Sequence, residues 1–156
     1  MKRALKAGFL GAFLAASAVY ADVGREEGLD EAVRQFAVTV EAEWQRCLKS
    51  PSTRTTHDSD LCLLAMVRTT NEKVEQKYQE KMVTAQHMVE HPDSLATYEQ
   101  VPSMLQASQS LWKQYVKADC DGVYAENAAG TARSGYALFC QYKHAIQRLR
   151  ALDEWL

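Results

Sequence analysis

LQASQSLWKQYVKADC, the stretch from Leu105 to Cys120, predicts a helix that carries an aromatic pair and ends at a cysteine. It contains neither glycine nor proline, and many of its residues are good helix formers. Trp112 and Tyr115 are three residues apart on one helix face, where an aromatic pair more often packs a core than forms a binding site. Cys140 is the next cysteine along the chain. We therefore expect a structural spine, whose aromatic pair packs the core and whose cysteine ties it to the following helix.

The rest of the chain also has helical patterns and predicts an all-α fold, a small four-helix bundle. Apolar residues recur every three or four positions, as on the buried face of a helix. The expected helices span approximately residues 29–50, 61–91, 102–126 and 134–156. The polar stretch 52–60 predicts a loop, in which Asp58, Ser59 or Asp60 caps the second helix. Residues 93–101 are expected to form a turn and a short helical segment, and no stretch predicts a strand.

The N-terminus has the organisation of a signal peptide. Basic residues precede an uncharged run at residues 7–18, and small residues stand before the expected cleavage after Ala21. The run is shorter than the ~20 residues that span a bilayer, which makes a retained membrane anchor the weaker alternative. We therefore expect residues 1–21 to be cleaved, leaving one helical domain over residues 22–156 that is periplasmic or secreted.

The predicted mature chain is acidic. Cleavage removes three of the 18 Lys and Arg residues and none of the 20 Asp and Glu residues, so the formal charge changes from −2 to −5. A net negative charge opposes binding to nucleic acid, because such binding depends on neutralising phosphates. The same charge favours the approach of cationic proteins. The composition therefore predicts a protein partner.

The four cysteines predict two disulfides, since an even number in an exported chain is typical of a disulfide framework. Three pairings are open. The sequential pairing, Cys47–Cys62 and Cys120–Cys140, staples each helix hairpin, and each bridge contributes about 3 kcal/mol in the chain-entropy model. The crossed pairings require distant helix ends to meet and rank second. Metal-binding cysteines usually come in closely spaced pairs, and these gaps are long, so no metal site is expected from them.

One local pattern is compatible with catalysis. Residues 87–91, HMVEH, fit the H-x-x-E-H motif, in which His87 and His91 bind zinc and Glu90 is the general base. Pro92 follows directly, so His91 lies where the helix ends, and the sequence indicates no third ligand. We interpret these residues as a polar helix end and keep a zinc peptidase as a minor alternative. Because the sequence contains no nucleophile motif or nucleotide-binding loop, we expect neither an enzyme nor a cofactor.

A set of residues in the second half of the chain has a distinctive spacing: Leu105, Gln109, Trp112, Tyr115, Cys120, Cys140, Arg148 and Leu152. With this spacing the chain resembles the LprI-like family of lysozyme-inhibitor domains. Cys47, Cys62 and Tyr78 extend the resemblance over nearly the whole predicted mature chain. The sequence departs from the family pattern at Val116-Lys117, where the pattern has Arg-Asp.

The resemblance implies an all-helical exported domain that binds and blocks a lysozyme. An acidic face or the loop expected at residues 121–139 would cover the substrate cleft of the lysozyme. The polar residues of that loop are the candidate partner-binding residues: Asp121, Glu126, Asn127 and Arg133. The alternative, from another functional class, is a periplasmic interaction or immunity protein that binds a different envelope partner or a toxin.

Overall fold

The protein is a bundle of long helices. The structure, a computed structural model, describes residues 15–93, 96 and 98–155, and the side chains among them from residue 31 onward. The described chain forms four helices, α1 (Ala15–Leu48), α2 (Thr56–Glu90), α3 (Val101–Glu126) and α4 (Arg133–Asp153), and no strand. None of these helices, within the residues described, is both long and apolar enough to cross a bilayer. The predicted all-α class is confirmed.

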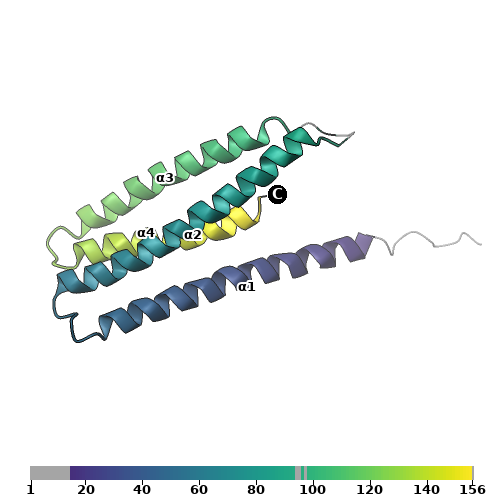
Figure 1. Cartoon of the computed structure of the whole chain (residues 1–156). Coiled ribbons are helices and arrows are strands. Elements are labelled where there is room, and N and C mark those ends of the chain that lie inside the picture. The colour runs from purple at the N-terminus through teal and green to yellow at the C-terminus, as the bar shows by residue number, and fades with distance from the viewer. Residues whose placement is uncertain (1–14, 94–95, 97, 156) are drawn as a thin grey trace, which may run out of the picture.

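The helices are arranged as two hairpins (Figure 1). The α1–α2 and α3–α4 connections lie at one end of the bundle, and the α2–α3 connection lies at the other. Cys47 is bonded to Cys62 and Cys120 to Cys140, so each hairpin is closed by its own disulfide, as the sequential pairing predicts. Both bridges therefore reinforce the same end of the molecule.

Helix α1 begins earlier than the sequence pattern predicts. The expected start lay after Gly28, yet the helix begins at Ala15 and includes both Gly24 and Gly28. A glycine within a helix costs about 1 kcal/mol relative to alanine, which neighbouring helix formers and the packing of the following turns can offset. Residues 1–14, most of the expected signal peptide, lie outside the described residues, so its cleavage stays a prediction.

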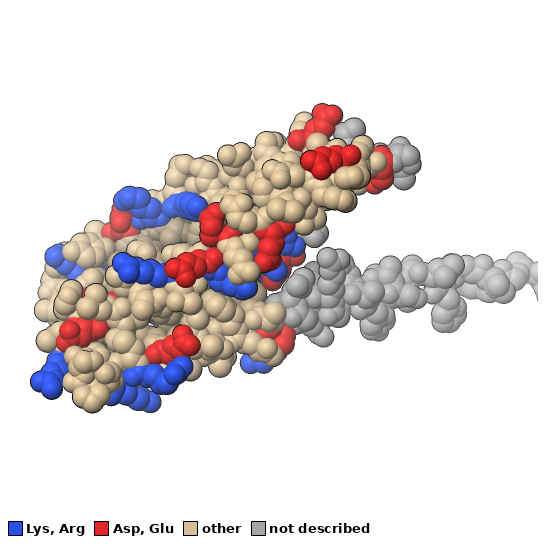
Figure 2. All heavy atoms as spheres, viewed as in Figure 1, with Lys and Arg blue, Asp and Glu red and all other residues tan. Residues whose placement is uncertain are grey.

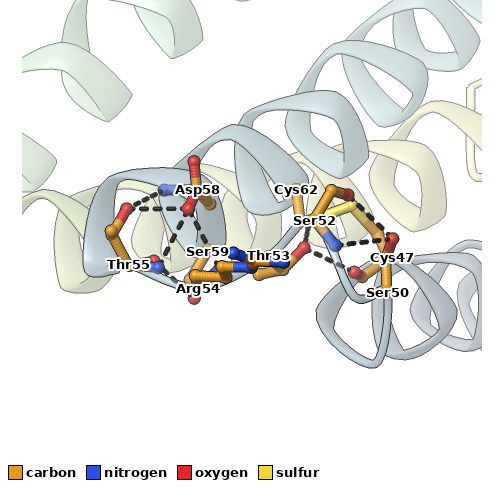
Figure 3. Close-up of a disulfide and its surroundings, with 9 residues drawn as sticks. All are labelled: Cys47, Ser50, Ser52, Thr53, Arg54, Thr55, Asp58, Ser59 and Cys62. Atoms are coloured by element: carbon orange, nitrogen blue, oxygen red, sulfur yellow. Dashed lines mark hydrogen bonds between the residues drawn. A yellow bond between two sulfur atoms is a disulfide. The ribbon is translucent and has the colours of Figure 1, made fainter.

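Helix α2 begins at Thr56, and its N-cap is Thr55 rather than one of the three residues expected (Figure 3). The Asp58 backbone N–H donates to Thr55 Oγ1 at 3.1 Å, and the Thr55 backbone N–H donates to Asp58 Oδ2 at 2.9 Å. This reciprocal capping box satisfies two of the N–H groups that a helix start leaves without partners. Asp58 thus takes part in the cap from the third helical position, which explains why the simpler prediction was wrong.

The α2–α3 connection has no helical segment among its described residues, contrary to the expectation for residues 93–101. The Asp93 carboxylate accepts hydrogen bonds from the Ala96 backbone N–H at 2.8 Å and the Tyr98 hydroxyl at 2.6 Å. The Val101 N–H donates to the Tyr98 carbonyl at 3.0 Å. Side-chain acceptors therefore replace the backbone bonds of a helical turn in this connection.

The core consists of two neighbouring clusters of buried apolar side chains. The first takes residues from all four helices: Val33, Val74, Leu105, Ala145, Leu149 and Leu152. The second takes residues from α1, α2 and α4: Val40, Leu63, Met66, Val67 and Tyr142. Phe36 and Ile146 pack against both clusters and join them. Helix α3 thus enters only the first cluster.

The aromatic pair of the spine is divided between core and surface. Trp112 packs against the first cluster, as predicted, but Tyr115 is 58% exposed, so the prediction for Tyr115 was wrong. The inward stripe of α3 runs through Leu105, Gln109, Trp112 and Cys120. Three residues turn a helix by 300°, which places Tyr115 at the edge of that stripe. There it packs edge-on against the His144 ring with the centroids 5.2 Å apart.

Candidate functional site

The α3–α4 hairpin is mostly helical where the sequence predicts the 121–139 loop. Helix α3 continues to Glu126 and α4 begins at Arg133, so only residues 127–132 connect them. Helix α3 passes through Gly122, and a Lys117–Asp121 ion pair of 2.5 Å spans one turn beside it. Such a pair stabilises a helix by a few tenths of a kcal/mol. These bounds agree with the helices predicted over residues 102–126 and 134–156, so the segment 121–139, described above as a loop, consists of two helix ends and a short turn.

The four predicted partner-binding residues lie in this hairpin, with different roles. Asp121 is exposed and paired with Lys117, and Glu126 is exposed at the last residue of α3. Asn127 is partly buried, and its Nδ2 donates to the Val123 carbonyl at 2.8 Å, which closes the C-terminus of α3. The first two side chains face solvent and can meet a partner directly. Asn127 instead shapes the turn.

Arg133, the fourth predicted residue, packs on an aromatic ring. Its guanidinium carbon lies 4.6 Å from the centroid of the Tyr124 ring, a cation–π arrangement that links the end of α3 to the start of α4. Tyr136 and Phe139 follow on α4, and the exposed fractions of Tyr124, Tyr136 and Phe139 are 39%, 57% and 38%. Aromatic residues and arginine are enriched at the centres of protein interfaces. The hairpin thus exposes the residue types that bind proteins.

Sequence reasoning missed these exposed aromatic residues. The expected stripe of α4 passes through Leu138 and Tyr142, and Tyr136 and Phe139 both fall outside it. Phe139 leans toward α1, with its ring centroid 6.3 Å from that of Trp44 and 5.8 Å from that of Tyr142. Aromatic residues off the core stripe were the signal that could have identified this surface.

The residues that carry the family resemblance lie mainly inside the bundle. Leu105 and Leu152 are fully buried in the first core cluster. Arg148 Nε donates to Gln109 Oε1 at 2.9 Å, and the Arg148 guanidinium lies 5.9 Å from the Trp112 ring centroid. Burial lowers the pKa of Arg148 from its ordinary value because the charged form loses hydration. These residues hold α3 against α4, which is a structural role.

A groove of about 410 Å³ lies among α2, α3 and α4, above the Gln109 amide. Trp112 supplies an apolar wall, and Lys113 at the rim forms an ion pair of 3.2 Å with Glu75. The Gln79 side-chain amide, and to a smaller extent Lys113, hold the pKa of Glu75 below its ordinary value. Lys117 and Asp121 form a second ion pair at the rim. The lining is balanced in charge, so the groove has no strong preference for anions or cations.

The opposite end of the bundle is acidic. Between Lys81 and Lys113 the sequence contains no Lys or Arg, whereas it contains Glu90, Asp93 and Glu99. Figure 2 shows acidic side chains gathered over this α2–α3 end, in the upper right of the view, without basic ones beside them. Elsewhere on that face the two signs are interspersed. On the face shown, this end therefore carries negative charge without neighbouring positive charge.

The candidate zinc-peptidase residues also lie at the acidic end. The His87 and His91 rings stack with their centroids 4.3 Å apart, and His91 Nδ1 lies 3.1 Å from the His87 carbonyl oxygen. Among the described residues no third ligand side chain joins them in a group able to hold one ion. The stacked rings at the helix end match the interpretation as a polar helix terminus.

Comparison with known proteins identifies one family. The family model described as "Lysozyme inhibitor LprI" matches residues 47–152, which is more than half of the chain and includes all four cysteines. No curated protein and no solved structure gave a match.

Proposed function

This chain belongs to the LprI family of lysozyme inhibitors, and we propose that it blocks a cationic lysozyme through the α3–α4 hairpin. The observation that carries the proposal is the family match over residues 47–152, which includes all four cysteines of the two disulfides. The family implies a protein partner such as a lysozyme, and inhibition by coverage needs no catalytic group. The two disulfides and the family fit an extracytoplasmic protein.

The shape and chemistry of the hairpin support this surface. The Cys120–Cys140 bond joins α3 to α4 six residues before the end of α3, which limits the motion of the tip. A preorganised tip binds more tightly because less conformational entropy is lost on binding. Tyr124 and Tyr136 offer broad, partly polar contact area, and Asp121 and Glu126 offer acceptors for the basic side chains of a lysozyme.

The acidic α2–α3 end acts in this proposal at a distance. Its charges attract a cationic partner and raise the association rate, whereas aromatic contacts at the hairpin set the dissociation rate. The acidic end is also the alternative docking surface. If the hairpin is the docking surface, the acidic charges control the association rate. If the acidic end is the docking surface, they also control the dissociation rate.

Inhibition assays with matched variants test the docking surface. The purified protein is titrated against a panel of cationic lysozymes, with cell-wall hydrolysis as the readout. Tyr136→Ala is expected to weaken inhibition about 30-fold, the result of losing roughly 2 kcal/mol at a hot spot. Tyr115→Ala is the matched control, because Tyr115 is equally exposed but lies outside the hairpin tip. Equal effects of the two variants would contradict docking through the hairpin.

A variant with fewer negative charges distinguishes the two possible docking surfaces, the α3–α4 hairpin and the acidic α2–α3 end. The double substitution Glu90→Gln/Glu99→Gln is expected to slow association at low salt and to leave dissociation unchanged. Faster dissociation of this variant would move the docking surface to the acidic end. If the protein inhibits no lysozyme at micromolar concentration, the lysozyme assignment is wrong. Capture of a specific partner from envelope extract would then support the interaction or immunity alternative.

We propose in addition that residues 1–21 are a signal peptide removed during export. The positive segment, uncharged run and small residues before the expected cleavage site support this. Intact-mass measurement of the exported protein tests it: the expected mass corresponds to a chain that starts at Asp22. A mass that corresponds to the full chain would contradict the proposal.

A further inference from the structure

Four side chains with metal-binding atoms meet where α3 packs on α4. Asp119 and Cys120 come from α3, and Cys140 and His144 come from α4. Each offers one ligand atom, and all four atoms lie within 4.8 Å of one another. Asp119 Oδ2 is 2.7 Å from His144 Nε2 and 3.7 Å from Cys140 Sγ. This is the one such group of three or more among the residues that the structure describes.

The positions of the four residues give the group a fixed geometry. Cys140 and His144 are four residues apart, so both side chains leave α4 on the same face. The cysteines are almost fully buried, whereas Asp119 is exposed and His144 is partly exposed. Tyr115 packs edge-on against the His144 ring and restricts its rotation. The group is therefore held rigidly on the core side and is open to ions on the solvent side.

The ligand set matches the chemistry of zinc. Zinc takes thiolate, imidazole and carboxylate ligands in tetrahedral geometry, with bonds of about 2.3 Å to sulfur and about 2.0–2.2 Å to nitrogen and oxygen. Atoms around such an ion are about 3.3–3.8 Å apart, by tetrahedral geometry on those bond lengths. The Cα atoms of Cys120 and Cys140 are 5.6 Å apart, so side-chain rotations can place two unbonded sulfurs at that spacing without moving the helices.

We propose that the dithiol form of Cys120 and Cys140, together with Asp119 and His144, is a four-ligand zinc site. Zinc and the disulfide are then alternative ways to close the same α3–α4 hairpin. Every chain is synthesised with free thiols, so the dithiol form precedes the bridge. Zinc bound at that stage holds the hairpin in register until oxidation.

The exchange of bound zinc for the disulfide balances in electrons and protons. When zinc binds, the two thiols lose two protons and their thiolates coordinate the ion. A disulfide of another molecule then serves as the oxidant and accepts two electrons and two protons, which gives two thiols. The two thiolates form the Cys120–Cys140 bond, and the zinc ion leaves because a disulfide has no thiolate to bind it.

The other cysteine pair provides an internal control. Near Cys47 and Cys62 the hydroxyl of Thr53 lies 3.8 Å from Cys62 Sγ and donates to the Cys47 carbonyl at 2.8 Å (Figure 3). Among the described residues no imidazole or carboxylate joins this pair in a metal-binding group. Two thiolates alone bind zinc more weakly than a complete four-ligand set. The proposal therefore predicts different behaviour of the two pairs in one molecule.

Alkylation of the reduced protein tests this difference. The full chain is reduced by a phosphine without oxygen, then treated with iodoacetamide with and without one equivalent of zinc. Peptide mass spectrometry is expected to show protection of Cys120 and Cys140 by zinc and full labelling of Cys47 and Cys62. Equal labelling of the two pairs would overturn the proposal. Cobalt in place of zinc is expected to give the visible absorption of a tetrahedral site with thiolate ligands.

A variant tests the imidazole ligand. In a Cys47→Ser/Cys62→Ser background, His144→Ala is expected to lower zinc affinity at least about tenfold. His57→Ala, which changes an exposed histidine outside the group, is expected to leave it unchanged. Unchanged affinity in His144→Ala would overturn the four-ligand site. If the reduced background protein loses its helices, zinc must restore the helical circular dichroism, and failure to do so would equally overturn the proposal.

Discussion

The buried contact between Gln109 and Arg148 offers the sharpest test of how the bundle is held together. The Gln109 side chain accepts a hydrogen bond of 2.9 Å from Arg148 Nε, and the two residues are only 3% and 7% exposed. Arg148 Nη2 and Gln109 Nε2 are buried without a hydrogen-bond partner. The single contact between them is therefore the main compensation for burying a guanidinium in this part of the core.

Substitution Gln109→Leu removes the acceptor and keeps the side-chain volume similar. A hydrogen bond to a charged group contributes about 1.5–3 kcal/mol, and removing its acceptor leaves the buried charge without hydration or a partner. We expect the free energy of unfolding to fall by about 2–3 kcal/mol. For a chain of this size the melting temperature then falls by roughly 5–10 °C. Arg148→Met alone should cost about 1–3 kcal/mol, because it leaves the Gln109 amide buried and unpaired.

The double variant Gln109→Leu/Arg148→Met decides between two explanations. Replacing both partners of a buried polar contact by apolar side chains is often neutral or stabilising. We therefore expect the double variant to lie within about 1 kcal/mol of the wild type, so that the single effects are far from additive. Urea unfolding followed by circular dichroism measures all four proteins of the cycle. Additive losses in the double variant would show that packing, not charge burial, controls this site, and would refute the reasoning.

Three further changes have defined outcomes. Thr55→Ala removes the capping side chain of α2 and should lower the free energy of unfolding by about 1 kcal/mol in urea titrations. The backbone N–H of Arg54, and then the side chain and N–H of Thr55, hold the pKa of Asp58 below its ordinary value. The stability from that carboxylate is thus present at neutral pH, above the unfolded pKa, and is lost as the pH falls through the depressed folded pKa. Asp58→Asn should reduce the fall in melting temperature between pH 7 and pH 2. If the variant shows the same pH dependence as the wild type, the capping-box explanation is contradicted. Leu105→Ala empties a fully buried position and should cost about 2–5 kcal/mol, and a loss below 1 kcal/mol would mean that the core closes around the cavity.

Regular spacing made the helices predictable, whereas their ends depended on contacts that spacing does not encode. The repeat of apolar residues identified all four helices and the partners of both disulfides. The start of α2 was misplaced because Thr55 and Asp58 cap it together, and several neighbouring residues are equally suited to an N-cap in isolation. The facing ends of α3 and α4 were predicted correctly, although the segment 121–139 between the cysteines was described as one loop. Local end effects of this kind are small in energy and easily overridden.

The hairpin that we propose as the docking surface was selected from the sequence, but the exposure of its aromatic residues was not predicted. The hairpin was selected because a disulfide constrains it, and its exposed tyrosines were overlooked because they lie outside the expected core stripe. Gln109 and Arg148 are 39 residues apart, and their contact requires a particular rotation of α3 against α4. The same rotation brings Asp119 beside His144 at a separation of 25 residues. The spacing of residues within one helix does not predict such contacts between two helices.

The residues that carry the family resemblance differ from those that we propose to contact a partner. Of the residues that carry the resemblance, Leu105, Gln109, Arg148 and Leu152 are buried, and Trp112 packs against the core. Tyr115 is the exposed exception. A pattern made mainly of interior residues indicates which bundle the chain forms, because those side chains fix how the helices pack. It does not report what the surface binds. The departure at Val116-Lys117 falls at the groove, where Lys117 pairs with Asp121. Under the proposed function, specificity depends on exposed residues such as Tyr124 and Tyr136, which lie outside the interior pattern.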